Sequence, residues 1–202
     1  MTLKKLVLFD IGGVLEVTPE VDWKVPWIQR LNLTRRVFLE RLQIVYRGGG
    51  TGAVQESDFE KSVAREFKLS PKLCEEFLND IWEDYLGSPN SELIDFFENL
   101  SSRCRTAILS NSFVGARRRE QERYGFEDLC ERIFYSHELG LLKPDSKIYE
   151  LVCTEMGVAP NQCFFFDDVE ENVQAARRLG MTSQLFQNNS KAKQDIEAFL
   201  KP

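Results

Sequence analysis

Acidic and small polar side chains follow the apolar segments of this chain at the points where strands would end. A single Asp in such a position is usually a turn residue or a helix cap. Several in chain order are a much stronger indication, because ligands of an open parallel sheet bind beyond the carboxyl ends of its strands. The set comprises Asp10, Ser110-Asn111-Ser112, Lys143-Pro144-Asp145 and Asp167-Asp168.

These side chains suit phosphoryl transfer. Asp10, Asp167 and Asp168 would bring three carboxylates together, which is unfavourable unless a cation neutralises them. Oxygen ligands select a hard ion, for which Mg²⁺ is the usual choice at a phosphate site. Mg²⁺ and Lys143 together would balance the three negative charges, so that Lys143, the Ser110 hydroxyl and backbone amides can hold an incoming phosphate. Asp10, at a rigid strand end, is the carboxylate best placed to act as nucleophile.

The charge balance indicates which partners the chain does not bind. The sequence has 26 basic and 32 acidic residues, a formal net charge of -6, which argues against nucleic acid and anionic membranes as partners. The basic run Arg117-Arg118-Arg119 is interpreted as a solvated helix face. The longest apolar runs have about four residues, far fewer than the ~20 that span a bilayer, so no membrane segment is expected.

The cysteines indicate a reducing compartment. Five Cys residues are scattered without a CxxC or Cys/His spacing, which disfavours a zinc site and a disulfide framework. The apolar run that begins at Leu6 stops at Asp10, so no cleavable secretory segment fits the start of the chain. We therefore expect a cytoplasmic protein with free thiols.

Short apolar segments alternate with helical patterns after residue 88. Continuous apolar character suits strands that are buried on both faces of a parallel sheet. Ser91 and Asp145 are predicted as helix caps, and Gly180 as a helix stop. This alternation predicts a doubly wound α/β core of Rossmann-like type. The expected strands lie at 6–9, 106–109, 132–135, 163–166 and 184–186, and the expected helices near 91–100, 145–156 and 170–179.

The segment between the first strand and residue 88 has a different pattern. It shows no convincing strand, only helical stretches at 35–46, 57–67 and 71–85, the last behind Ser70. Gly48–Gly52 lacks the lysine of a P-loop and no strand precedes it, so we interpret it as a flexible turn between helices. The sequence therefore predicts an all-helical cap at 16–87, inserted into an α/β core formed by 1–15 and 88–202.

Four motifs follow one another along the chain: Leu8-Phe9-Asp10-Ile11-Gly12-Gly13-Val14-Leu15, Leu109-Ser110-Asn111, Gly140-Leu141-Leu142-Lys143-Pro144-Asp145 and Phe166-Asp167-Asp168-Val169-Glu170-Glu171-Asn172-Val173. Their order resembles that of the haloacid dehalogenase superfamily hydrolases, of the phosphatase type with a small helical cap. The resemblance covers essentially the whole chain. It implies that Asp10 becomes an aspartyl-phosphate, that Ser110 and Lys143 bind the phosphate, and that Asn111 lies beside it.

The same resemblance implies a Mg²⁺ site. Asp168 would bind the ion directly and Asp167 through water, and Asp10 belongs to the ligand set. Gly12 departs from the family pattern at this point, because most of the family's phosphatases carry a second Asp there. That Asp protonates the leaving group and later activates water. The backbone carbonyl of Gly12 can still serve as a metal ligand, but it cannot transfer protons.

The missing acid bears directly on activity, since general acid-base groups contribute ~10²–10⁴ in rate. Glu16, Glu20 and Asp22, at the entry to the cap, are candidate replacements, although each is more simply explained as a solvated surface carboxylate. The first prediction is a Mg²⁺-dependent phosphomonoester hydrolase for a small phosphorylated metabolite, with a good leaving group or a borrowed acid. The alternatives are a binding or regulatory protein with weak or no turnover, and a 2-haloacid dehalogenase. Dehalogenases need no metal, so the pair Asp167-Asp168 disfavours the latter.

Other polar and aromatic side chains have simpler interpretations. The three tryptophans of the predicted cap are interpreted as packing between helices rather than as the lining of a pocket. His137 is interpreted as a structural residue. Asn172 could orient Asp168 or Lys143, or could face solvent.

Overall fold

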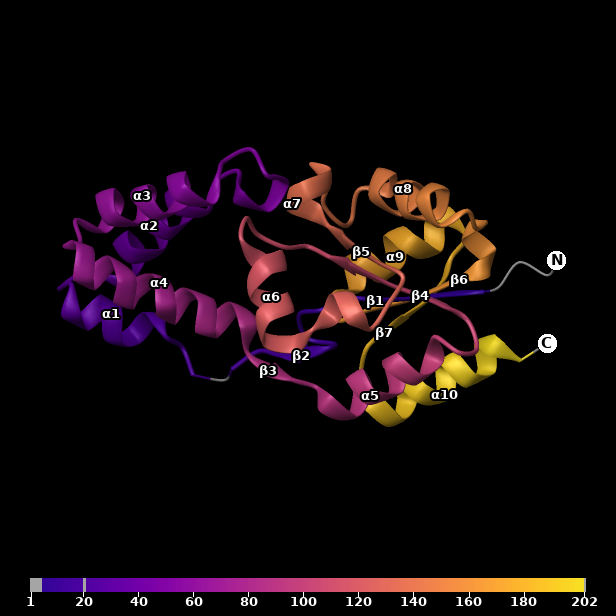
Figure 1. The fold of residues 1–202 in the computed structure, drawn as a ribbon. Helices are drawn as coiled ribbons and strands as arrows, with labels where there is room; N and C mark the ends of the chain where they lie inside the picture. The colour runs from indigo at the N-terminus through magenta and orange to yellow at the C-terminus, as the bar shows by residue number, and fades with distance from the viewer. Residues whose placement is uncertain (1–4, 20, 202) are drawn as a thin grey trace.

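Five parallel strands form the central sheet of the computed structural model, which describes residues 5–19 and 21–201. The strands lie in the order β5-β4-β1-β6-β7, so the chain winds outward from β1 in both directions (Figure 1). The predicted doubly wound α/β core is therefore confirmed, with β7 slightly upstream of its expected position. The strands are β1 (Leu6–Phe9), β4 (Arg105–Ser110), β5 (Arg132–Tyr135), β6 (Cys163–Asp167) and β7 (Thr182–Leu185).

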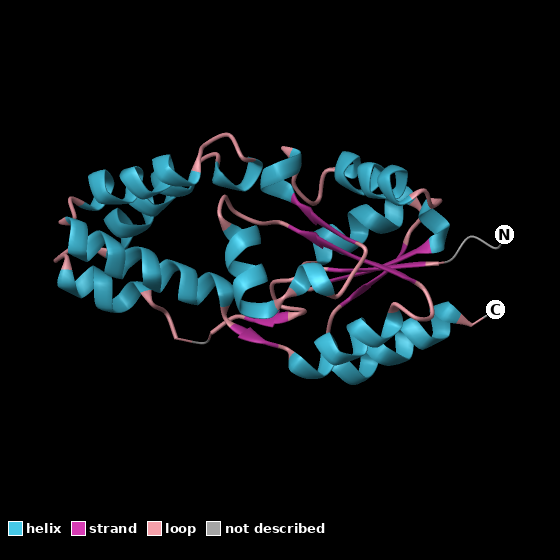
Figure 2. Cartoon of the chain, in the orientation of Figure 1, coloured by secondary structure: helices cyan, strands magenta, loops and turns pink. Residues whose placement is uncertain are grey.

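Helices cover both faces of this sheet (Figure 2). Val7 and Phe9 of β1 join an apolar cluster with α5 and α10, whereas Leu6 and Leu8 join a second cluster with α8 and α9. Successive strand side chains point to opposite faces, which explains this division. None of the described helices is long and apolar enough to cross a membrane. The covering helices are α5 (Ser91–Leu100), α8 (Ser146–Met156), α9 (Glu170–Leu179) and α10 (Asn189–Leu200).

Four further helices pack together at one end of the molecule (Figure 1). Their apolar faces form a cluster of their own, which includes Trp27, Phe38 and Phe77. The sequence pattern missed the first of these helices, because it is short and carries Pro26 in its first turn. The helices are α1 (Lys24–Arg30), α2 (Arg35–Tyr46), α3 (Glu56–Phe67) and α4 (Pro71–Leu86).

Local capping explains where several helices begin. Asp145 caps α8, as predicted, and Ser70 caps α4; each accepts a hydrogen bond from a backbone amide. The prediction for Ser91 is wrong, because Ser91 is the first residue of α5 and Asn90 occupies the cap position. The Asn90 amide donates to the Val14 carbonyl at 2.8 Å, which ties the start of α5 to the segment after β1.

The chain enters and leaves the helical segment through a short antiparallel ladder. Strand β2 (Glu16–Val17) pairs with β3 (Ser88–Pro89), with Glu16 opposite Pro89. The prediction that no strand occurs at 16–87 is therefore wrong at its first two residues. Two residues are too few to produce a pattern of alternating polarity. The cap boundaries at 16 and 87 stay a prediction.

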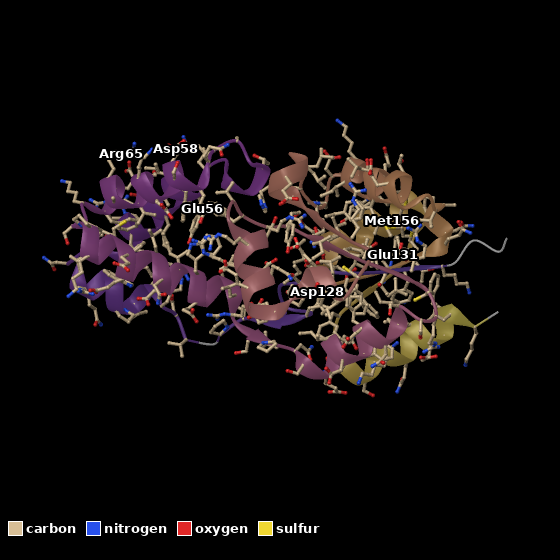
Figure 3. The ribbon with its side chains drawn as sticks, viewed as in Figure 1. Glu56, Asp58, Arg65, Asp128, Glu131 and Met156 are labelled. Carbon is tan, nitrogen blue, oxygen red and sulfur yellow. The ribbon has the colours of Figure 1, made fainter. Side chains whose placement is uncertain are left out.

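Helix α6 (Ala116–Tyr124), which follows β4 in the chain, contacts the cap. Arg118 and Arg119 of this helix form ion pairs with Glu56 of α3, which Figure 3 labels on the side of the cap that faces α6. The solvated face predicted for the run at 117–119 is wrong in this respect. These side chains reach an acidic residue that is distant in sequence, which a local charge pattern does not reveal.

The glycine segment at 48–52 also packs against the core. Ser136, at the start of α7 (Ser136–Leu139), donates from its hydroxyl to the Gly50 carbonyl at 2.8 Å. A Cβ on Gly49 would lie 1.9 Å from the Phe113 ring, so only glycine permits this approach. The segment is a turn between α2 and α3, as predicted, but its glycines serve close packing rather than flexibility.

Candidate active site

The carboxyl ends of β1 and its two neighbours meet at one edge of the sheet. Phe9 of β1 pairs in register with Ile108 of β4 and with Phe166 of β6. Because the strands are parallel, the residues that follow Phe9 and Phe166 emerge at the same edge. These residues are Asp10 and Asp167.

Lys143 binds two of the carboxylates at this edge. Its Nζ lies 2.8 Å from Asp10 Oδ1 and 2.6 Å from Asp167 Oδ2, and it donates to the Leu109 carbonyl at 3.1 Å. Asp10, Asp167 and Asp168 each offer one oxygen within 4.8 Å of the others. The structure therefore brings together the four charged residues that were singled out in the sequence.

The electrostatics of this cluster favour an additional cation. Burial raises the pKa of Asp10 to about 7, although Lys143 acts in the opposite direction. Burial also opposes the charge of Lys143, but its ion pairs with Asp10 and Asp167 raise its pKa above the usual value. Burial and the charge of Asp167 raise the pKa of Asp168. Three carboxylates and one ammonium leave two negative charges, and an all-oxygen donor set fits Mg²⁺.

Both oxygens of Asp167 are held by hydrogen bonds. Oδ1 accepts from the Val169 amide at 2.8 Å and from Asn172 Nδ2 at 2.9 Å, and Oδ2 accepts from Lys143. The expectation that Asn172 would orient Asp168 or Lys143 is wrong, because its partner is Asp167. The fully buried Asp167 is thus fixed by its neighbours, whereas Asp168 is exposed.

Gly13 shapes the approach of Asp168. Its φ is +69°, a conformation that favours glycine, and a Cβ there would lie 2.3 Å from Asp168 Oδ2. Both the backbone conformation and the close approach therefore require glycine. The segment after β1 also holds the nucleophile candidate, since the Ile11 amide donates to Asp10 Oδ1 at 2.8 Å.

Glu16 occupies the space beside Gly12. Its Oε2 lies 3.7 Å from the position that a Cβ on Gly12 would take. The residue is 2% exposed, and Oε1 has no hydrogen-bond partner among the described residues. Burial raises the pKa of Glu16 to about 8. Glu16 is therefore not a solvated surface carboxylate, which is the simpler explanation that its sequence position favoured.

Asp22, a second candidate acid, does not share this position. Asp22 lies before α1, where it forms ion pairs with Arg35 at 3.1 Å and with Lys24 at 3.4 Å. Glu20 lies outside the described residues. Of the two described candidates, Glu16 is the one that the structure brings to the segment after Asp10.

Asn111 positions the chain that carries Lys143. Its Nδ2 donates to the Lys143 carbonyl at 2.9 Å, and its Oδ1 accepts from the Lys143 amide at 2.8 Å. The amide group is thus engaged with backbone, while the preceding Ser110 ends β4 as a buried residue. Nothing in the local sequence pattern indicates this pairing, because the two residues are far apart in the chain.

A sequence model of the haloacid dehalogenase-like hydrolase family matches residues 4–180. The chain belongs to this family. The resemblance seen in the four motifs is therefore confirmed, and the chain is a hydrolase of the phosphatase-containing group. A D-ribitol-5-phosphate phosphatase from Bacteroides thetaiotaomicron is 24% identical over 97% of this chain and 98% of its own length.

Two further relatives of this haloacid dehalogenase-like hydrolase differ in how much they share with it. Bifunctional epoxide hydrolase 2 from Rattus norvegicus is 32% identical over 96% of this chain, which spans 38% of the length of that relative. A HAD family enzyme from Bacteroides thetaiotaomicron, solved with magnesium and inorganic phosphate, has a TM-score of 0.74 at 21% identity. The alignment covers 91% of this chain and 94% of that one. This likeness shows the fold.

A cavity of about 280 Å³ in the hydrolase lies between the cap and the segment after β4. Asn111 and Ser112 line its core side, and Tyr46, Trp82 and Asp84 are among the residues on its cap side. The cap tryptophans were interpreted as packing between helices, but Trp82 also lines this cavity. Sequence reasoning missed Tyr46 and Asp84, because a helical pattern does not distinguish a residue that lines a cavity from one that faces solvent. A larger hollow of about 850 Å³ also touches Trp82, but none of the carboxylates at the sheet edge lines it.

Proposed function

We propose that this hydrolase is a Mg²⁺-dependent phosphomonoesterase that acts on a small phosphorylated metabolite through an aspartyl-phosphate on Asp10. The observation that carries the proposal is the bond of the Lys143 ammonium to both Asp10 and Asp167, with Asp168 in the same cluster. A buried lysine between carboxylates at a sheet edge can hold a phosphoryl group against the nucleophile. The fold-level likeness to a magnesium and phosphate complex supports the same reading.

In the first step, Asp10 attacks the phosphorus atom. The new bond joins its carboxylate oxygen to phosphorus, while the bond from phosphorus to the leaving oxygen breaks and its electron pair stays on that oxygen. Lys143 and the Ser110 hydroxyl hold the phosphoryl oxygens. Asp10, Asp168 and the Gly12 carbonyl, together with Asp167 through water, would hold Mg²⁺, whose charge would offset that of the transferred group.

The leaving oxygen must then acquire a proton. We assign this role to Glu16, because its carboxylate lies beside Gly12, where the family's second Asp would stand. Glu16 gives its proton to the leaving oxygen, and then takes one from the water that attacks the aspartyl-phosphate. That attack releases inorganic phosphate and restores Asp10, so protons balance over the cycle.

The test is phosphate release from a panel of esters, with Mg²⁺ and with EDTA. The panel runs from acyl and anomeric phosphates to alkyl esters, and it includes D-ribitol 5-phosphate because the Bacteroides relative is named for that substrate. We expect turnover that requires the metal and that is lost in Asp10→Asn. Phosphate and Mg²⁺ binding without turnover would instead establish a binding protein, and halide release from a 2-haloacid without metal would establish a dehalogenase.

A further inference from the structure

We propose that Asp84 determines substrate specificity, by favouring phosphomonoesters whose organic part is neutral and hydroxylated over those that carry a second acidic group. The inference rests on the proposed phosphatase function. It concerns the side of the cavity that the cap forms. The residues on that side belong to none of the four sequence motifs.

The cavity borders the segment that directly follows Ser110, and Asp84 lines its cap side. Asn111, which lines the core side, directly follows Ser110 and is hydrogen-bonded to the backbone of Lys143. The Lys143 ammonium lies 2.8 Å from Asp10. An ester whose phosphate lies at Lys143 therefore extends its organic part toward the cap wall, where Asp84 lies.

Three of the polar side chains around this cavity are already engaged by protein partners. Ser112 Oγ lies 2.6 Å from Nδ1 of His137, and the amide of Asn111 is bonded to backbone. The Tyr85 hydroxyl is hydrogen-bonded to Glu120. The lining groups that can still bond to a substrate are therefore Asp84, Tyr46 and Trp82, whose Nε1 has no hydrogen-bond partner among the described residues.

Asp84 keeps hydrogen-bonding capacity for a substrate. Its carboxylate accepts one hydrogen bond from the Trp23 side chain. A carboxylate offers about four acceptor positions, so others remain. It accepts hydrogen bonds and cannot donate them while ionised, which matches a substrate hydroxyl that donates. The hydroxyl of Tyr46 lies on the same side of the cavity and can both donate and accept.

The charges nearby favour a neutral organic part over an ionised one. Of the described residues that line the cavity, Asp84 is the one with a charged side chain. Its basic neighbour Lys24 is 3.4 Å from Asp22, and Arg35 is 3.1 Å from the same carboxylate. The carboxylates of Asp22 and Asp84 balance Lys24 and Arg35, so this group of side chains carries no spare positive charge for a second anion. A carboxylate on the substrate would instead face Asp84, and repulsion between the two negative charges would disfavour binding.

The test compares two esters that differ at one position. Glycerol 3-phosphate carries a hydroxymethyl group where 3-phosphoglycerate carries a carboxylate. We expect kcat/KM to favour glycerol 3-phosphate by about tenfold, as repulsion between one pair of like charges across the cavity would produce in an effective dielectric of about 20. Asp84→Asn removes the charge and keeps the shape, and should bring this ratio close to one. The ratio is measured within each variant, so a loss of folded protein cancels.

The matched control is Asp58→Asn, which removes a carboxylate from the outer edge of the cap (Figure 3). It should leave the ratio unchanged. An unchanged ratio in Asp84→Asn would overturn the assignment of Asp84, as would preference of the native chain for 3-phosphoglycerate. A preference for 2-aminoethyl phosphate over 2-hydroxyethyl phosphate would overturn the inference that the organic part of the substrate is neutral. Hydrolysis of no ester at all with Mg²⁺ present would overturn the proposed function itself, and this inference with it.

Discussion

Gly13 allows a direct test of how Asp168 is placed. The substitution Gly13→Ala adds a Cβ at a φ of +69°, where a residue other than glycine costs about 1–2 kcal/mol. The added atom would also lie 2.3 Å from Asp168 Oδ2. An ordinary contact requires more than 3.4 Å, so the carboxylate has to move by about 1 Å. The substitution thus combines backbone strain with displacement of a proposed metal ligand.

The substitution Gly157→Ala separates these two effects. Gly157 has a φ of +60°, and a Cβ on it would meet no heavy atom within 4 Å. Both variants should therefore lose about 1–2 kcal/mol of stability, which lowers the Tm of a domain of this size by roughly 2–8 °C. Only Gly13→Ala should raise the Mg²⁺ concentration for half-maximal turnover, by roughly 10–100-fold, the usual effect of disturbing a ligand's orientation.

Two measurements on each variant decide the matter. Thermal unfolding followed by circular dichroism reports the shared strain, and phosphate release at increasing Mg²⁺ concentration reports the metal site. If Gly13→Ala and Gly157→Ala had comparable Tm values and the same Mg²⁺ dependence, the argument would be refuted. The placement of Asp168 next to Gly13 would then not matter for metal binding.

The remaining predictions concern three buried polar side chains. Glu16→Gln should lower kcat by about 10²–10³ for alkyl phosphates and much less for acyl phosphates, whose leaving groups need no proton; equal losses would contradict its role as proton donor. Asn172→Ala removes a hydrogen-bond donor from Asp167, so it should cost about 1 kcal/mol of stability and lower kcat/KM. Asn172→Asp should lower both stability and kcat/KM further, because it adds a carboxylate beside Asp167. A smaller loss in Asn172→Asp than in Asn172→Ala would contradict the contact between Asn172 and Asp167. Glu120 is 2% exposed, and burial raises its pKa from the usual 4.5 to about 7. The neutral form of Glu120 therefore contributes its full stabilisation below pH 4.5, and this contribution is lost as the pH rises through about 7. Between pH 5 and pH 8, the free energy of unfolding measured with denaturant should decrease less in Glu120→Gln than in the native chain, by up to about 3 kcal/mol. Equal decreases in the two proteins would show that Glu120 does not titrate in this range.

The core strands were predictable because burial on both faces leaves a continuous apolar signal. Leu6–Phe9 and Cys163–Phe166 carry that signal with a carboxylate directly after each of them. The parallel arrangement then brings the ends of such strands together without any further information. This is why Asp10 and Asp167 could be grouped before any geometry was known.

The partners of individual side chains were not predictable in the same way. The amide of Asn111 pairs with the backbone of Lys143, and the carboxylate of Glu16 fills the space beside Gly12. Each arrangement depends on how two distant segments approach one another, and no local periodicity records that approach. Glu16 in particular looks like any acidic residue near a surface loop until its burial is known.

The pairing of β2 with β3 has a consequence for how the hydrolase can change over time. It brings the start and the end of the helical insertion to neighbouring points, with Glu16 opposite Pro89. Topologically the insertion is one long hairpin loop, and the entropy of closing a loop rises only slowly with its length. A different insertion could therefore be grafted onto the same two strands without re-registering the sheet that carries the nucleophile. Such an exchange would alter which molecules are admitted while the reaction stays the same.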